Sequence, residues 1–240
     1  MTRSLPDVHE IWVYLSGSPL LALFLTLAAY QAGVVIYERL GRNPLANPVA
    51  IAVLLVAGVI SVIDMPYAKY FEGAQFVHFL LGTATVALAV PIHRSLKELR
   101  GRIVPLFAAV LAGGATSIAS AVGIARLLGA DETIVGGLYA KSVTAPIAMG
   151  VAERIHASPT LTAVFAITTG ILGAVLARFV LNAVGSKAWW QRGFALGIAA
   201  HGIGTARAFS VDPEAGRFAG LAMGLHGILG AVLIPLVVRH

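Results

Sequence analysis

The sequence has no cysteine and few charged residues. Without cysteine, disulfide bonds and thiolate metal sites are excluded. Lys, Arg, Asp and Glu make up only 12% of the 240 residues, whereas soluble domains contain roughly 25%. Hydrophobic residues make up 58%, and the mean hydropathy is +0.86. These values are typical of an integral membrane protein.

Acidic residues are missing from the interiors of the long apolar segments. Those that come closest lie near predicted segment ends: Asp64, Glu72, Asp131, Glu132, Glu153, Asp212 and Glu214. Carboxylates that bind sodium or relay protons lie inside membrane segments. The pattern therefore disfavours sodium coordination by buried carboxylates and a two-carboxylate proton pump. We expect no metal and no cofactor.

Signatures of catalysis and of nucleic-acid binding are also missing. The sequence has no H-E-x-x-H and no G-x-S-x-G motif. Ser142 follows Lys141 directly, but adjacent residues on a helix do not face each other, so a Ser–Lys dyad is disfavoured. The net charge is +6, yet the basic residues are scattered between apolar segments. We expect neither an enzyme nor a nucleic-acid partner.

Apolar segments predict an all-α membrane protein whose residues 1–131 form scaffold helices. A segment of about twenty apolar residues can cross a bilayer. A basic cluster at 94–102 predicts a cytoplasmic loop. The first sixteen residues lack the pattern of a signal peptide, so we expect insertion without cleavage. The expected scaffold segments are 19–37, 48–63, 73–92 and 103–128.

Two glycine-flanked stretches, 136–146 and 197–207, interrupt the later apolar segments. Each carries an ionisable residue beside hydroxyls, with a proline in the first stretch and two glycines in the second. Irregular backbone at membrane depth is tolerated where it lines a cavity or is buried in protein. We predict that both stretches are broken helices that form a site.

The part of the chain after residue 131 repeats itself. The heptapeptide Gly-Ile-Leu-Gly-Ala-Val-Leu occurs at 170–176 and again at 227–233, and one broken stretch precedes each copy. This pattern predicts a repeated unit of broken segment plus spanning helix, over 132–182 and 189–238. Both copies would belong to a single transmembrane domain of residues 1–240.

Loop charges help to place the broken segments. If both are re-entrant, Lys and Arg divide eleven to five between the two sides, with Lys141 left out, and if both span, the division is nearly even. The positive-inside rule therefore favours about six spanning helices and two hairpins that enter from opposite faces. The repeat would then be inverted, as in many transporters.

The first break predicts a site for a small organic anion. Pro146 suits the first position of a second half-helix, where its missing amide hydrogen costs nothing, and Ala145 is pushed out of helical geometry. Ser142 and Thr144 add hydroxyls, and Lys141 adds a positive charge whose burial a bound anion would offset. In the alternative interpretation, Lys141 lies in an interfacial loop and extends to the membrane surface.

The second break predicts further substrate contacts. Gly202 and Gly204 permit unwinding, and Thr205 can cap the following turn. Arg207 has a fork suited to a carboxylate. His201 titrates near neutral pH and could carry a proton with the substrate. The alternatives are a helix-packing role for His201 and an ordinary loop position for Arg207.

Three other features are interpreted as helix packing. His78, on the third apolar segment, and His226, on the last, are interpreted as packing residues. The small residues at 113–117 let neighbouring helices approach closely.

Several strings are similar to the LrgB/CidB family. They are Lys141-Ser142-Val143-Thr144-Ala145-Pro146-Ile147-Ala148-Met149, the string at 169–174, His201-Gly202-Ile203-Gly204-Thr205-Ala206-Arg207-Ala208, and the string at 81–91. The resemblance runs from about residue 43 to the carboxyl end. Many relatives have a second threonine where this chain has Ala145 and a glutamate where it has Gly150.

The resemblance implies a multi-pass protein of the bacterial cytoplasmic membrane. Members of the family are described as holin-like or antiholin-like modulators of murein hydrolase activity and cell lysis. Kinship with plastid glycolate/glycerate carriers and bacterial pyruvate transport systems is also implied. The implied partners are the lipid bilayer and a small LrgA/CidA-type membrane protein, a homo-oligomer, or both.

Two functions therefore compete. The first is a carrier of small monocarboxylates by alternating access, which the breaks, the repeat and the buried cation favour. The second is a holin-like or antiholin-like regulator of murein hydrolase export and autolysis without carrier activity. For the regulator the sequence offers only small-residue helix faces.

Overall fold

A computed structural model describes residues 19–43, 45–87 and 103–238 of the chain. These residues form nine α-helices and no strand, as predicted for an all-α protein. The helices belong to two compact units, Met1–Ala84 and Thr85–His240, and each is described by itself. The assignment of residues 1–240 to one transmembrane domain stays a prediction.

The first unit contains helices α2 (Pro19–Arg39), α3 (Pro48–Val62) and most of α4 (Tyr67–Ala87). Asn47 caps α3 by accepting hydrogen bonds from the amides of Val49 and Ala50. Helix α2 approaches α3 closely at Gly33, where an added Cβ would lie 2.6 Å from the Pro48 carbonyl oxygen. A 2.7 Å hydrogen bond between the hydroxyls of Thr26 and Tyr70 joins α2 to α4.

The helix bounds agree with the sequence except at the third segment. Helix α4 begins at Tyr67, earlier than the predicted residue 73, because Pro66 ends the turn that follows α3 and the next residues are free to start a helix. The first turns of α4 contain the charged residues Lys69 and Glu72, so the apolar segment predicted from the sequence begins only after them. The end of the predicted segment, the basic cluster 94–102 and the first sixteen residues lie outside the described residues.

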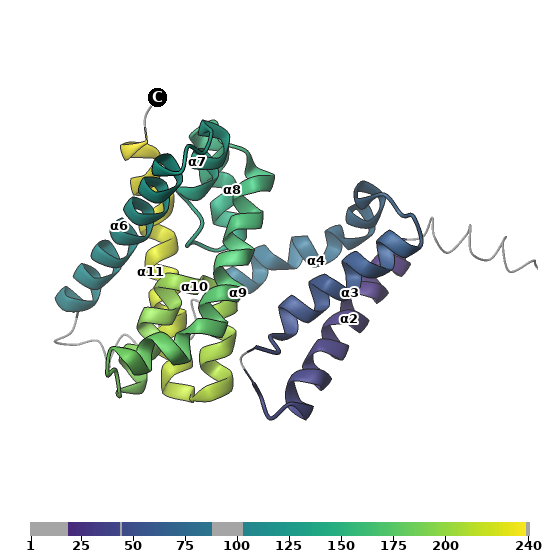
Figure 1. The fold of residues 1–240 in the computed structure, drawn as a ribbon, viewed down its shortest axis with the longest axis horizontal. Coiled ribbons are helices and arrows are strands. Elements are labelled where there is room, and N and C mark those ends of the chain that lie inside the picture. Colours follow the sequence, from purple (N-terminus) through teal and green to yellow (C-terminus); the bar gives the residue numbers. More distant parts are fainter. Residues whose placement is uncertain (1–18, 44, 88–102, 239–240) are drawn as a thin grey trace, which may run out of the picture. The chain divides into compact units, whose positions relative to one another are not determined.

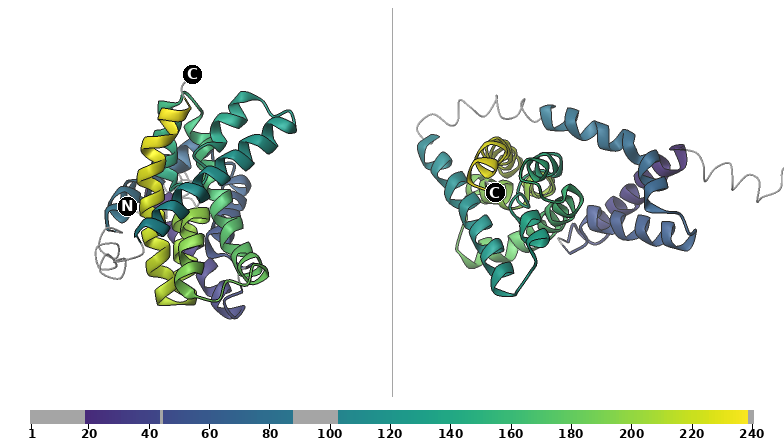
Figure 2. Two further views of the ribbon diagram at one scale, coloured as in Figure 1. Left: turned by 90° about the vertical axis from the view of Figure 1, so that its left-hand side faces the viewer. Right: turned by 90° about the horizontal axis from the view of Figure 1, so that it is seen from above.

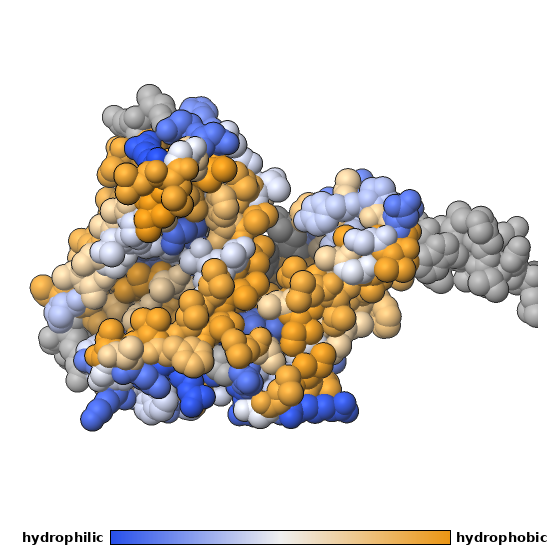
Figure 3. All heavy atoms as spheres, viewed as in Figure 1, coloured by the Kyte–Doolittle hydropathy of each residue, from blue (hydrophilic) through white to orange (hydrophobic). Residues whose placement is uncertain are grey.

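The second unit is built around helices α6 (Ile103–Leu127), α9 (Pro159–Ala183) and α11 (Pro213–Val237). Together with Leu20–Arg39, these are four helices long and apolar enough to cross a membrane among the described residues. Helix α3 is apolar but shorter. Figure 3 shows that this unit carries apolar residues over most of its middle and hydrophilic residues toward its ends.

Helices α7 (Glu132–Leu138) and α8 (Ala145–Arg154) form a hairpin at one end of this unit (Figure 1). The Asp131 carboxylate caps α7 by accepting from the amide of Ile134. Both ends of the hairpin lie at one small pocket, which is lined by Arg126 and Glu132 and by 155–158. The first broken segment is therefore a hairpin whose two ends lie together, and its re-entry into a membrane stays a prediction.

Helix α10 (Trp189–Val211) also folds back on itself. Its first arm packs its glycines Gly193 and Gly197 against Ala215 and Ala219 of α11, in the same chain order. In its second arm the order is reversed, because Phe209 meets Gly216 and Thr205 meets Gly220. Helix α11 runs the full height of the unit in Figures 1 and 2, whereas α10 lies against its first half. The second broken segment is therefore a hairpin too.

Candidate functional site

Lys141 lies at the tip of the α7–α8 hairpin, between the two helices. Its ammonium group is half-buried and donates hydrogen bonds to Ser117 Oγ at 2.9 Å and to Ser142 Oγ at 3.3 Å. The two serine hydroxyls are themselves 2.6 Å apart. Ser117 stands near the middle of the 25-residue helix α6. This contact with the middle of an apolar helix favours a buried Lys141 over the alternative interpretation, in which Lys141 lies in an interfacial loop.

The hairpin tip is shaped by Thr144. Its extended conformation (φ −60°, ψ 143°) ends the break, and helix α8 starts at Ala145 with Pro146 as its second residue. The expectation that Ala145 is non-helical and Pro146 the first helical residue is thus wrong by one position. Proline is tolerated anywhere in the first turn, because no amide there has an intrahelical partner. The Thr144 hydroxyl is buried and has no hydrogen-bond partner among the described residues.

A cavity of about 910 Å³ opens beside Lys141. Helices α6, α9 and the first arm of α10 form its walls. Lys141 is the only charged side chain among the described residues that line it, and the other polar ones are Ser117, Thr169 and Gln191. Apolar side chains such as Leu106, Leu172 and Phe194 cover the rest. The cavity therefore presents one cation in a largely apolar wall.

The contact between Lys141 and the two serines corrects one argument made from the sequence. A Ser–Lys pair was disfavoured because neighbours on a helix do not face each other. Lys141 and Ser142 lie in the break instead, where the backbone is not helical, so the ammonium reaches both hydroxyls. Experiment must therefore discriminate a Ser–Lys dyad from a binding site.

His201 forms the tip of the α10 hairpin. Its backbone (φ 40°, ψ −130°) makes the turn, rather than the flanking glycines as expected. Its buried ring bonds the Ala166 carbonyl of α9 through Nε2 at 2.8 Å. A carbonyl oxygen only accepts, so Nε2 carries a hydrogen. The ring does not line the cavity beside Lys141.

The residues that follow His201 hold the hairpin together. Gly204 is buried where a Cβ would come within 2.8 Å of the Leu196 carbonyl oxygen, so the two arms meet there. Gly202 lies near Met223 of α11. Thr205 Oγ1 donates to the His201 carbonyl at 2.8 Å, so it bonds backwards along its own helix instead of capping a following turn. None of the three lines the cavity beside Lys141.

Arg207 lies apart from Lys141. It lines a second cavity, of about 610 Å³, which shares no lining residue with the first. The structure therefore does not bring the two predicted cationic site residues to one cavity. His226 is buried, with its ring against Gly114 of α6, whereas the side chain of His78 lies outside the described part.

Three polar residues of the cavity escaped the sequence analysis: Ser117, Thr169 and Gln191. Ser117 belongs to the 113–117 string that was interpreted as a packing face. Its signal was a hydroxyl in the middle of a spanning segment, in a chain with one cation at similar depth. Small hydroxyl residues are common on helix faces, and only the fold selects the one that meets Lys141.

The two copies of the heptapeptide pack against the hairpins in a reciprocal way. In α9, Gly170 and Gly173 face His201 and Ala200 at the tip of the α10 hairpin. In α11, Gly227 and Gly230 face Ile147 and Val143 of the α7–α8 hairpin. Each spanning helix thus gives its glycines to the hairpin of the other copy.

Comparison with known proteins gives one family. The model of the LrgB-like family matches residues 26–240. A protein of Staphylococcus epidermidis described as "Holin-like protein CidB" is 29% identical over 218 residues, 91% of this chain and 95% of that protein. The "Uncharacterized protein YwbG" of Bacillus subtilis is 32% identical, over 90% of this chain and 96% of that protein. No solved structure matches.

The described residues contain no group of three His, Cys, Asp or Glu side chains placed to hold a metal ion.

Proposed function

This chain belongs to the LrgB-like family, and from that premise we propose that it carries small monocarboxylates across the bacterial cytoplasmic membrane as a multi-pass protein. The substrates we propose are of the pyruvate, glycolate and glycerate type. The observation that carries the proposal is the position of Lys141, the only charged side chain among the described residues that line a largely apolar cavity.

The charge balance around Lys141 supports an anionic ligand. A cation in the middle of a membrane helix costs about 2.5–3.5 kcal/mol on insertion scales. Ser117 and Ser142 accept two of the three hydrogens of the ammonium group but carry no negative charge. A carboxylate would accept the third hydrogen and neutralise the charge. Thr169 offers a further hydroxyl from the wall formed by α9.

The proposed movement is alternating access by an inverted repeat. The two hairpins and the reciprocal packing of the glycines against them support this part of the proposal. In such a carrier the hairpin tips move against a fixed scaffold, so that the site opens to one side at a time. We assign the scaffold role to residues 1–131.

Proton coupling is a separate part of the proposal and rests on His201. Its ring lies at the second hairpin tip and bonds the Ala166 carbonyl. Movement of α10 against α9 would break this bond and expose the ring. His201→Gln is then expected to retain exchange of labelled substrate and to lose uptake driven by a proton gradient. Unchanged gradient-driven uptake would remove His201 from the coupling mechanism.

Uptake by vesicles that contain the purified protein tests the carrier function. Saturable uptake of pyruvate, glycolate or glycerate is expected, and Lys141→Met is expected to abolish it. Lys69→Met, at an exposed position on α4, removes the same charge and serves as the matched control. No uptake of any of the three compounds, alone or with a small membrane partner, would overturn the proposal.

The variant Ser117→Ala distinguishes transport from Ser–Lys catalysis. A carrier would lose one hydroxyl next to Lys141, so uptake should fall by about tenfold, the value of one lost hydrogen bond. An enzyme that used Ser117 as its nucleophile would lose all turnover, and an active-site phosphonate would label the native serine. Labelling of Ser117 would count against the carrier.

The names of the staphylococcal relatives favour a second candidate function. A holin-like protein would regulate murein hydrolase export and autolysis, as a homo-oligomer or with a small LrgA/CidA-type membrane protein. Expression in a host that lacks its own family members would then change the rate of autolysis. If Lys141→Met changes autolysis as the native chain does, the regulatory function does not depend on carboxylate flux.

A further inference from the structure

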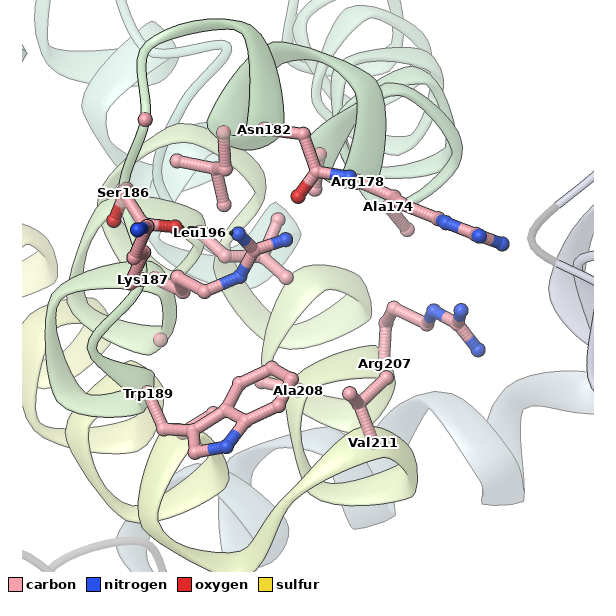
Figure 4. A pocket seen from close by; sticks show the side chains of 16 residues that line it. Ala174, Arg178, Asn182, Ser186, Lys187, Trp189, Leu196, Arg207, Ala208 and Val211 are labelled. Atoms are coloured by element: carbon pink, nitrogen blue, oxygen red, sulfur yellow. Dashed lines mark hydrogen bonds between the residues drawn. The ribbon is translucent and has the colours of Figure 1, made fainter.

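The cavity that contains Arg207 lies at the end of the second unit where α9 ends and α10 begins. Four cationic side chains line it: Arg178, Lys187, Arg192 and Arg207. No acidic side chain is among the described residues that line this cavity of about 610 Å³. In Figure 4, Lys187 lies on one side of the cavity and Arg178 and Arg207 lie on the other. Arg178, Lys187 and Arg192, with no carboxylate among the described lining residues, favour an anionic occupant.

Arg192 is held in a defined position at this cavity. Its Nη1 donates to the Ser186 carbonyl at 2.7 Å, and its guanidinium lies 5.5 Å from the centre of the Trp189 ring. The backbone contact fixes the side chain, and the ring adds a cation–π attraction. A guanidinium fixed in this way keeps other donors available for a phosphate oxygen.

The cavity lies at the level of the membrane surface. Arg178 stands five residues before the last residue of α9, about 8 Å from that helix end at 1.5 Å per residue. Ser186 and Lys187 belong to the connection between α9 and α10. Trp189 is 40% exposed, and tryptophan is enriched where lipid headgroups meet the hydrocarbon. The cations are therefore at the depth of lipid phosphates.

Apart from Asn182 and Ser186, most of the remaining lining is apolar. It includes Ala174, Leu181, Leu196, Ala208 and Val211. This cavity shares no lining residue with the cavity beside Lys141, so its occupant need not be the carboxylate proposed there. An occupant that carries both a negative phosphate and hydrocarbon matches cations at the rim and apolar side chains behind them.

We propose that this cavity binds the phosphate group of an anionic phospholipid, with the start of an acyl chain against its apolar wall. In this proposal Arg192 contacts the phosphate, and Arg178 and Lys187 add positive charge around it. Cations that only extend to the membrane surface would attract anionic lipid as a diffuse layer and would retain none on purification. A built site retains a bound lipid.

Native mass spectrometry of the full chain, purified from membranes that contain phosphatidylglycerol and phosphatidylcholine, tests the proposal. One retained phosphatidylglycerol per chain is expected, in preference to phosphatidylcholine. The variant Arg178→Gln/Lys187→Gln, at two exposed positions, should weaken retention about 30-fold, the factor for two cations that attract anionic lipid. The control Arg126→Gln/Arg154→Gln removes two exposed charges at the hairpin end of α7 and α8 and should retain the lipid.

Equal retention of the two lipids, or equal loss in both double variants, would overturn the proposal. Quenching of Trp189 by phosphatidylglycerol with brominated acyl chains should disappear in Arg178→Gln/Lys187→Gln, measured in Trp12→Phe/Trp190→Phe chains. A competition experiment in phosphatidylcholine discs separates lipid from soluble phosphate. If millimolar inorganic phosphate abolishes the quenching that added brominated phosphatidylglycerol causes, the site binds a soluble phosphate compound and the lipid assignment fails.

Discussion

The two hairpin tips occupy corresponding places in the repeat but contact different partners. At the first tip the chain leaves helical geometry over several residues, and Lys141 bonds side-chain hydroxyls beside a cavity. At the second tip a single residue, His201, makes the turn, and its ring bonds a backbone carbonyl away from that cavity. The first tip presents a charged side chain to a cavity, and the second is hydrogen-bonded to helix α9.

This difference shows how similar sequence patterns serve unlike roles. Both breaks contain an ionisable residue, a hydroxyl and a small or rigid residue. A side-chain hydroxyl can rotate and exchange its partner for a ligand, whereas the Ala166 carbonyl is held in place by helix α9. We therefore expect variants at the first tip to change transport and variants at the second to change stability.

The largest effect is expected when one variant at each tip is compared in both uptake and melting temperature. Lys141→Met should lower kcat/KM for carboxylate uptake by about 100-fold or more, because a charge-assisted contact is worth up to about 3 kcal/mol. Its melting temperature should stay level or rise, since a buried cation is removed and the serines still bond each other. His201→Ala should lower the melting temperature and leave the exchange of labelled substrate unchanged, although uptake driven by a proton gradient is lost. A single variant that loses both properties equally would break the distinction between the tips.

Two substitutions at His201 separate the loss of the ring from backbone strain. Both His201→Ala and His201→Gly lose the bond to the Ala166 carbonyl, which leaves a buried acceptor and costs about 1–3 kcal/mol. Both variants must adopt the positive φ of 40°, but only alanine is strained there, so it should be less stable than the glycine variant by about 1 kcal/mol. Thermal melting in one detergent measures the order. Equal melting temperatures would mean that the backbone is not strained at this position.

The heptapeptide copies offer a matched pair of glycines. An alanine at Gly170 would place its Cβ 2.8 Å from the His201 ring, which is tied to the Ala166 carbonyl. An alanine at Gly227 would meet only Ile147 Cδ1, the mobile end of a side chain, at 2.9 Å. Gly170→Ala should therefore destabilise by about 1–3 kcal/mol and Gly227→Ala by less than about 1 kcal/mol. The opposite order in thermal melts would assign the tighter packing to the Lys141 hairpin.

The smallest effect is expected at Arg207. Because it lines a cavity separate from that of Lys141, Arg207→Gln should change the KM for carboxylate uptake by less than about twofold. Initial uptake rates over a range of substrate concentrations measure this value, with Lys141→Met as the positive control. A tenfold rise in KM would show that Arg207 takes part in substrate binding.

Local patterns determined much of this protein. Hydropathy predicted the bounds of the apolar helix α6 to within one residue. A helix that crosses lipid must be apolar along its own length, so its sequence alone marks it. Pro146 and the glycines beside 141 and 201 marked both interruptions, since these residues limit or free the backbone wherever they stand. A single charged residue, Lys141, within an apolar stretch of sequence indicated a functional site.

Only the tertiary structure decided which side chains meet. It brought Ser117 of α6 to Lys141, although the two are far apart in the sequence. It placed Arg207 at a different cavity, although Arg207 belongs to the second glycine-flanked stretch. It also made His201 the turning residue in place of the neighbouring glycines. Contacts between distant helices depend on how each hairpin folds back and on which helix it packs against. These are properties of the whole arrangement that no short stretch of sequence contains.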